Sequence, residues 1–215
     1  FDMAVIHIYM NPCDAMGANV INQVCEYLKD PLEQFTNEKV TMCILSNLVD
    51  SKLVRATVTM DTIDLELAQK IEEASRFAEL DPYRAATSNK GVLNGIDPIL
   101  IATGNDWRAV EAGIHAYATQ QNTKNSPNQK YSSVTKWRKI DNKLIGVFEA
   151  PIVVGTVGGV TTLHPSAKIA MKMLNVSSAN ELACIMGAVG LVQNLGALRA
   201  LTTVGIIEGH MKLHI

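Results

Sequence analysis

The chain has 215 residues, of which 47% are hydrophobic and 19% charged, and its formal net charge is −2. These values describe a soluble globular protein large enough for one or two domains, and they argue against a disordered chain. The lack of a basic surplus disfavours a nucleic-acid partner. No uninterrupted apolar run reaches the roughly 18–20 residues of a membrane helix, so no membrane partner is predicted.

The first quarter of the chain has a β-α-β pattern. Residues 3–10 and 40–45 are rich in β-formers and predict strands, and residues 54–60 predict a third strand. Apolar residues recur at helical spacing over 17–28, which predicts an amphipathic helix that ends before Pro31. No Gly-x-Gly-x-x-Gly pattern follows a strand, so a Rossmann fold is not predicted.

The remainder of the chain is predicted to be mostly helical. Helical periodicity covers 61–79, 106–120, 164–174 and 178–201, residues 144–154 predict a strand, and the polar run 121–129 predicts an exposed loop. The last helix carries an apolar stripe made of Leu182, Ile185, Val189 and Val192. Glycines within it, Gly187, Gly190 and Gly196, lower its helix propensity and indicate close approach of another helix or a ligand.

Cysteine and histidine spacing gives no sign of a metal site. The four cysteines, Cys13, Cys25, Cys43 and Cys184, form no Cys-x-x-Cys pair, so neither zinc nor a disulfide framework is predicted. His210 and His214 are four residues apart, but no third ligand or acidic partner accompanies them. We therefore expect free thiols in a reducing cytoplasm and no bound metal.

A lysine among small and polar residues is the first candidate for chemistry. Lys90 lies in Asn89-Lys90-Gly91-Val92-Leu93-Asn94-Gly95, and Asp106 follows it in Gly104-Asn105-Asp106-Trp107-Arg108. A paired, desolvated lysine has a tunable pKa, so the two side chains are a candidate acid and electrostatic pair for carbonyl chemistry. On spacing alone, an exposed lysine and a helix-capping aspartate would be the commoner outcome.

Longer motifs reveal a resemblance to a known family. They are Asp81-Pro82-Tyr83-Arg84-Ala85-Ala86-Thr87, residues 102–113, Asp14-Ala15-Met16-Gly17-Ala18-Asn19, Gly155-Thr156-Val157-Gly158-Gly159, Gln193-Asn194-Leu195-Gly196 and Gly209-His210-Met211. Together they closely resemble 3-hydroxy-3-methylglutaryl-CoA (HMG-CoA) reductase of the bacterial and archaeal class, class II. The resemblance covers essentially the whole chain.

The resemblance implies an α+β fold built from parts of two domains. Residues 1–55 would form the C-terminal part of a small ferredoxin-like NAD(P)-binding domain. Residues 56–204 would form a larger, mostly helical substrate-binding and catalytic domain, and 205–215 would begin a C-terminal flap. Family members continue in both directions, so we expect this chain to be the central to C-terminal portion of a longer enzyme. The catalytic glutamate of the family lies upstream, in a Glu-Pro-Ser type motif that is not in this sequence.

The resemblance also assigns catalytic roles. Lys90 matches the lysine that stabilises negative charge on the carbonyl oxygen and can donate a proton. Asp106 matches the aspartate that sets the protonation state of this lysine, and Asn94 matches a substrate-binding polar residue that orients the set. If residues 90–94 are helical, Lys90 and Asn94 share a face. His210 matches the histidine that protonates the departing CoA thiolate, for which an imidazolium is a suitable acid.

Further residues are assigned to binding. Arg84 matches a residue that binds the substrate carboxylate, and Asn194 is a candidate for the same substrate, although a buried amide explains Asn194 equally well without the family. The family uses the 14–19 motif for the dinucleotide, which assigns Asp14, Met16, Gly17, Ala18 and Asn19 to the cofactor. Gly158 and Gly159 would let the nicotinamide or the substrate approach the backbone. An aspartate N-cap followed by a glycine turn is the simpler explanation of the 14–19 motif.

The implied activity is the reduction of HMG-CoA to mevalonate and CoA by two hydride transfers from NADH or NADPH, in the mevalonate pathway of isoprenoid biosynthesis. The implied assembly is a cytoplasmic homodimer, or a higher assembly of dimers, with the site near a subunit boundary. Two other functions are compatible with the motifs: another acyl-CoA or aldehyde oxidoreductase on the same scaffold, and a non-catalytic CoA- or nucleotide-binding fragment.

Overall fold

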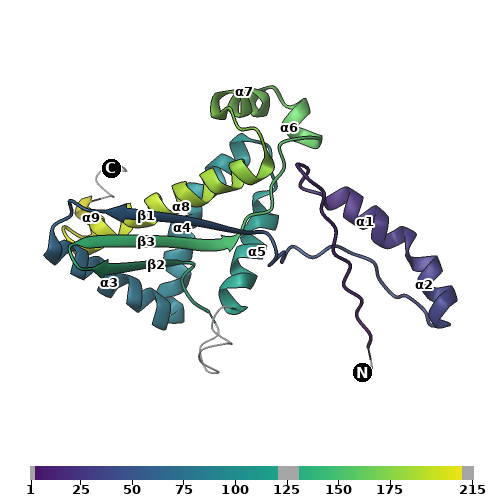
Figure 1. Ribbon diagram of the computed structural model, residues 1–215, viewed down its shortest axis with the longest axis horizontal. Coiled ribbons are helices and arrows are strands. Elements are labelled where there is room, and N and C mark those ends of the chain that lie inside the picture. The colour runs from purple at the N-terminus through teal and green to yellow at the C-terminus, as the bar shows by residue number, and fades with distance from the viewer. Residues whose placement is uncertain (1–2, 121–130, 210–215) are drawn as a thin grey trace.

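The computed structural model describes residues 3–120 and 131–209. Within them the fold is α+β, as predicted, with helices and three strands in one sheet (Figure 1). The elements in chain order are α1 (Ala18–Tyr27), α2 (Lys29–Thr36), β1 (Leu53–Met60), α3 (Leu65–Leu80), α4 (Pro82–Ala102), α5 (Trp107–Gln120), β2 (Thr135–Ile140), β3 (Lys143–Pro151), α6 (Gly159–Leu163), α7 (Pro165–Leu174), α8 (Ala179–Thr202) and α9 (Ile206–Gly209).

The sheet is antiparallel, and β3 is its central strand. β1 pairs with β3 so that Val54 lies opposite Ala150, and β2 pairs with β3 so that Trp137 lies opposite Gly146. Alternate residues of the strands point inward, and Phe148 and Trp137 are completely buried there. A side chain on Gly146 would come within 2.3 Å of the Trp137 ring, so this glycine is needed for the indole to lie flat across β3.

Helix α8 forms the middle of the core, between the sheet and α4 (Figure 1). It is the one described helix that is long and apolar enough, by length and composition, to cross a membrane. Here it packs as a core helix, with Leu182, Met186 and Leu198 at most 1% exposed. The predicted close approach is confirmed at Gly187, which faces Val54 and Phe148, and at Gly190, which faces α4. It was wrong at Gly196, which has open space beside it.

The predicted apolar stripe of α8 was wrong in part. Leu182 is buried, but Val189 is 37% and Val192 64% exposed. The helix instead buries a stripe that contains small residues, listed here in full: Ala179, Leu182, Ala183, Met186, Gly187, Gly190, Leu191, Asn194 and Leu198. Side-chain hydrophobicity misplaced the stripe because the tightest contacts are made through glycine and alanine, which let the backbones approach.

Residues 3–50 form an arm that extends away from the sheet and its helices (Figure 1). The predicted helix over 17–28 is confirmed as α1, but the strands predicted over 3–10 and 40–45 were wrong, because both segments are irregular. A β-ladder needs a neighbouring strand to satisfy its backbone groups. In the described part of the chain, the sheet contains only β1, β2 and β3, and none of them pairs with the arm.

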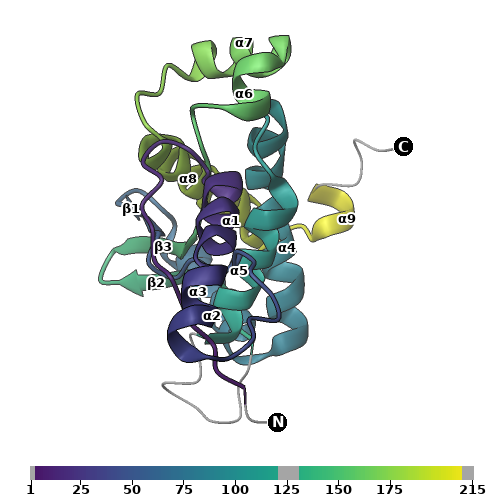
Figure 2. The ribbon, with the colours of Figure 1, turned by 90° about the vertical axis from the view of Figure 1, so that its right-hand side faces the viewer.

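The other predicted elements are confirmed within a few residues at their ends: 54–60 as β1, 61–79 as α3, 106–120 as α5, 144–154 as β3, 164–174 as α7 and 178–201 as α8. Five elements were not predicted: α2, α4, β2, α6 and α9. The predicted loop over 121–129 lies outside the described residues. Figures 1 and 2 place α6 and α7 together at one end of the molecule, near the end of α4.

Candidate active site

Three loops from distant parts of the sequence enclose one cavity of about 330 Å³. They are the turn that leads into α1, the turn between α4 and α5, and the loop that follows β3. The cavity is lined by six of the residues predicted to bind the cofactor, Met16, Gly17, Ala18, Asn19, Gly158 and Gly159, together with the predicted catalytic residue Asp106. The fold therefore brings together three motifs that are far apart in the sequence.

Glycine allows two of these loops to touch. A side chain on Gly155 would lie 2.5 Å from the Met16 backbone nitrogen, so only glycine permits this approach. The Thr156 N–H donates to the Asp14 carbonyl oxygen at 2.8 Å and joins the same two loops. Gly17 begins α1 at φ +99°, a left-handed conformation that favours glycine. The rim of the cavity is therefore backbone that a ligand can approach closely.

Asp14 holds the arm to the body of the protein. Its Oδ1 accepts a hydrogen bond from the Ala179 N–H at 2.9 Å, at the first turn of α8. It is not the N-cap of α1 that the simpler explanation of the motif predicted, because that position is Gly17 and no side chain caps the helix. The predicted contact between Asp14 and the cofactor stays a prediction; the contact visible here is between the arm and α8.

The turn between α4 and α5 is tied to the glycine loop by Asn105. Its Oδ1 accepts from the Gly155 N–H at 2.8 Å, while its Nδ2 donates to the Gly155 carbonyl at 3.2 Å and to Thr103 Oγ1 at 3.0 Å. The next residue, Asp106, is exposed and accepts from the Ala109 N–H at 3.1 Å, which caps α5. Asn105 was not singled out from sequence; its position beside Asp106 after a glycine was the only signal.

Lys90 and Asn94 lie one helical turn apart on α4, so they share a face as expected, and both are exposed. Arg84, two turns earlier, is half-buried, and this burial lowers the pKa of its guanidinium. Lys90 and Asp106 are not brought together. The helix is continuous from Lys90 to Ala102, a rise of about 18 Å, and Asp106 lies beyond its end.

A buried asparagine fixes the turn of α4 that carries Lys90. Asn89 is completely buried; its Oδ1 accepts from the Val134 N–H at 3.0 Å and its Nδ2 donates to the Ser132 carbonyl at 2.9 Å. The same Nδ2 donates to the Tyr131 hydroxyl at 3.1 Å, and this hydroxyl lies 2.7 Å from His115 Nδ1. These bonds anchor the helix to the segment that leads into β2, so Lys90 projects from a rigid support.

Asn194 lies in the core, 2% exposed. Its Oδ1 accepts from Trp137 Nε1 at 2.8 Å and from Thr135 Oγ1 at 3.0 Å, and its Nδ2 donates to Ser88 Oγ at 3.3 Å. This is the buried-amide alternative, with side chains as the partners. A substrate contact for Asn194 stays a prediction and would require it to exchange one of these bonds. The predicted acid His210 lies outside the described residues.

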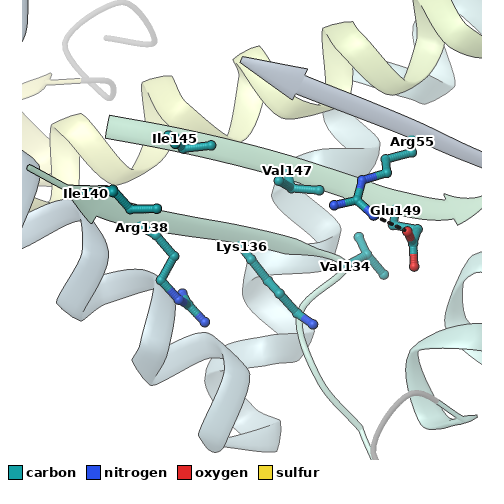
Figure 3. Close-up of a pocket in the computed structure, with 8 residues that line it drawn as sticks. All are labelled: Arg55, Val134, Lys136, Arg138, Ile140, Ile145, Val147 and Glu149. Atoms are coloured by element: carbon teal, nitrogen blue, oxygen red, sulfur yellow. Dashed lines mark hydrogen bonds and ion pairs between the residues drawn. The ribbon is translucent and has the colours of Figure 1, made fainter. Parts of the chain in front are cut away.

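A second cavity of about 330 Å³ lies on the outer face of the sheet (Figure 3). Its charged side chains are Arg55, Lys136, Arg138 and Glu149, from all three strands. Arg55 and Glu149 form an ion pair at 3.5 Å, and Arg138 turns toward Glu79 of α3 at 2.6 Å. No residue predicted to bind substrate or cofactor lines this cavity, so the first cavity is the candidate active site.

The sequence model of the family described as hydroxymethylglutaryl-coenzyme A reductase matches residues 1–215. The chain belongs to the HMG-CoA reductase family. Among curated relatives, the 3-hydroxy-3-methylglutaryl-coenzyme A reductase of Archaeoglobus fulgidus is 44% identical over 99% of this chain and 48% of its own length. A probable reductase of the same name from Borreliella burgdorferi is 37% identical over 98% of this chain and 49% of its own length.

Solved structures of HMG-CoA reductase share this fold. A reductase from Streptococcus pneumoniae has a TM-score of 0.83 and 42% identity over 95% of this chain and 49% of its own. A class II reductase from the same organism, bound to NADPH in open conformations, has a TM-score of 0.82 and 43% identity over 94% of this chain and 50% of its own. The chain thus spans about half the length of the HMG-CoA reductases it matches.

Proposed function

We propose that the protein carrying this chain is an HMG-CoA reductase that converts HMG-CoA to mevalonate and CoA with NADH or NADPH. The observation that carries this proposal is the cavity in which the 14–19 motif, the Asp106 turn and the 155–159 loop meet, in a chain of the reductase family. We place the enzyme in the cytoplasm, which agrees with its composition. Residues 1–55 would complete a ferredoxin-like small domain, and 205–215 would begin the flap that carries His210.

The first cavity is suited to a dinucleotide. The N-terminus of α1 opens onto it, and no side chain caps that helix, so its first N–H groups can bind phosphate oxygens. Gly158 and Gly159 have open space where a side chain would stand, which leaves room for a flat ring against the backbone. When bound, the nicotinamide cofactor supplies the hydride for each reduction. The NADPH in the class II reductase of Streptococcus pneumoniae supports this choice of ligand.

The residues of the chain would serve the substrate as follows. The Lys90 ammonium holds positive charge at the carbonyl oxygen, where each reduction places negative charge, and one such preorganised group contributes about 3–4 kcal/mol. Asn94 orients this set on the same face of α4. The planar fork of Arg84 binds the substrate carboxylate, Asn194 is a second substrate ligand, and His210 protonates the departing thiolate.

The separation of Lys90 from Asp106 supports a site shared between two copies of the chain. A helix that continues to Ala102 keeps the two residues of one copy apart by roughly its 18 Å rise. Asp106 can act on the ammonium of Lys90 only at contact distance, so a homodimer in which one copy supplies the lysine and the other the aspartate would complete the pair. Higher assemblies would repeat this dimer.

The test is an assay of nicotinamide oxidation by the full-length protein with HMG-CoA and with other acyl-CoA thioesters. The proposal expects HMG-CoA to be the preferred substrate and mevalonate the product. Preference for another thioester or an aldehyde would indicate a different oxidoreductase on this scaffold. A folded, full-length protein that binds NADPH and CoA but never oxidises the cofactor would indicate a binding function instead.

A further inference from the structure

Asn105 stands between two parts of the candidate active site. It immediately precedes Asp106, and its side chain reaches across to the loop that follows β3. One amide makes two bonds to the backbone of a single residue, accepting from the Gly155 N–H and donating to the Gly155 carbonyl. The two bonds hold the peptide groups on either side of the Gly155 Cα, so they fix both the distance and the rotation of the loop, which one bond would not do.

Both hydrogens of the Asn105 amide and one of the two acceptor positions of its oxygen are used within the protein. One Nδ2 hydrogen goes to the Gly155 carbonyl and the other to Thr103 Oγ1, and Oδ1 accepts from the Gly155 N–H. The Thr103 hydroxyl is in turn bonded to the Ile99 carbonyl at 2.7 Å, in the last turn of α4. Asn105 thus connects the end of the helix that carries Lys90 to the glycine loop, and it does so without needing a ligand.

The same loop is held from its other side by the arm. Gly155 packs against the Met16 backbone, and the Thr156 N–H donates to the Asp14 carbonyl. The peptide group between Gly155 and Thr156 is therefore bonded to two walls of the cavity, through its C=O to Asn105 and through its N–H to Asp14. Any shift of Asn105 would move the glycine loop relative to Asp106.

We propose that Asn105 is a positioning residue for the reductase reaction. Its amide fixes the position of the 155–159 loop relative to Asp106, so that the backbone proposed to bind the cofactor and the Asp106 carboxylate keep a constant separation and orientation. This inference rests on the proposed function. It predicts that loss of the amide affects cofactor binding and the carboxylate together, because Asn105 joins the loop to the Asp106 turn at the wall of the cavity.

The test compares Asn105→Ala with the full-length wild-type enzyme. We expect the KM for NADPH to rise about ten-fold, which corresponds to about 1.4 kcal/mol, the order of the hydrogen bonds lost. The KM for HMG-CoA should stay within about two-fold, and the pH profile of kcat should shift because the carboxylate of Asp106 is displaced. Asn142→Ala, at the exposed turn between β2 and β3, is the matched control and should change none of these quantities.

A purely structural role would lower the melting temperature and the yield of active enzyme while leaving the NADPH KM and the pH profile unchanged; that result overturns the inference. If Asn105→Ala does not fold, Asn105→Asp decides, since it keeps the size and the acceptor for the Gly155 N–H but sets an oxygen against the Gly155 carbonyl. A wild-type NADPH KM and pH profile in Asn105→Asp would equally overturn it. A wild-type enzyme inactive on HMG-CoA would instead reject the proposed function.

Discussion

The arm and the body of this molecule differ in what their apolar side chains touch. In the arm, neither α1 nor α2 buries a single residue, and Val5 and Phe35 are 69% and 90% exposed. In the body, Trp137 and Phe148 are completely buried between the sheet and α8. Both regions contain amphipathic helices, α1 and α2 in the arm and α3 and α7 in the body. Helix formation therefore follows from local sequence, whereas burial depends on what lies opposite.

The arm nevertheless builds one wall of the candidate active site. It contacts the body through the Asp14 carboxylate at Ala179, through the Asp14 carbonyl at Thr156, and through the Asn47 backbone beside Gly113. The wall proposed to be catalytic belongs to the body, where Asn89 bonds α4 to Val134, just before β2, and Asn194 bonds α8 to Trp137 of β2. A change at Lys90 or Asn194 in the body should therefore affect kcat or stability, and a change at Asp14 in the arm should affect cofactor binding.

The largest effect is expected at Lys90, on the body side. Lys90→Ala should lower kcat at least about 100-fold, because it removes positive charge needed chiefly in the transition state. The melting temperature should stay unchanged, since the Lys90 side chain is exposed and its support, Asn89, remains. Steady-state kinetics and a thermal melt check this. A near-normal kcat with only a raised KM would show that Lys90 merely binds substrate.

Asn194 should dominate stability in the same region. Asn194→Leu would leave the Trp137 and Thr135 donors without their acceptor in the core, which costs about 1–3 kcal/mol for each buried unsatisfied group. Denaturant unfolding measures the change in free energy, with the exposed Asn142→Ala as control. An unfolding free energy equal to that of the wild type would mean that this buried network does not stabilise the fold.

Much of this fold could be predicted from sequence, and the failures have physical causes. Periodicity located α5, α7 and α8 because an amphipathic helix satisfies its own backbone. The strands predicted over 3–10 and 40–45 failed because strand formation needs a neighbour that propensity does not report. Helix α4 was not predicted because the glycines and polar residues around Lys90 interrupt the periodic spacing of its apolar residues.

The site was predictable in its motifs and unpredictable in its geometry. The 14–19 and 155–159 motifs were assigned to the cofactor by resemblance, and they line one cavity. That Asn105 joins the second motif to Asp106 depends on a contact across 50 positions of sequence, which spacing cannot reveal. The separation of Lys90 from Asp106 could not be predicted either, because it depends on α4 continuing without a break to Ala102.

A substitution at Asp14 tests whether the contact between the arm and α8 supports cofactor binding. Asp14→Ala removes the acceptor for the Ala179 N–H and should loosen the arm by about 1 kcal/mol without unfolding the body. The expected result is a several-fold rise in the NADPH KM with a main thermal transition close to that of the wild type. Asp30→Ala, in the first turn of α2, is a control that removes an arm carboxylate far from this contact. A loss of kcat at saturating cofactor would place Asp14 in the chemistry instead.

The smallest effect is expected at Asp97, a partly buried carboxyl of the body whose ionised form destabilises the fold. Burial, then the facing charge and hydrogen bonding of Glu111, raise the pKa of the Asp97 carboxyl from 3.8 to about 6. Asp97 Oδ1 is buried without a hydrogen-bond partner. When both are ionised, the carboxylates of Asp97 and Glu111 can only accept hydrogen bonds, so a hydrogen bond between them requires that one of them be protonated.

The sign of the pH dependence follows from this raised pKa. The folded protein holds the Asp97 proton more tightly than the unfolded chain, so this carboxyl favours folding fully below about pH 4 and loses that contribution as the pH rises through 6. Asp97→Asn cannot ionise, and its advantage over the wild type should grow between these pH values and stay constant above them. Because the carboxyl is only partly buried, we expect the melting temperature of Asp97→Asn to exceed that of the wild type by roughly 2–4 °C at neutral pH.

Melting temperatures measured across this pH range test the prediction. Glu111→Gln is the matched variant, and its melting temperature should rise less, because the burial of Asp97, which is the larger cause of the raised pKa, remains. Parallel pH curves for the wild type and Asp97→Asn would show that the two carboxyls do not share a proton.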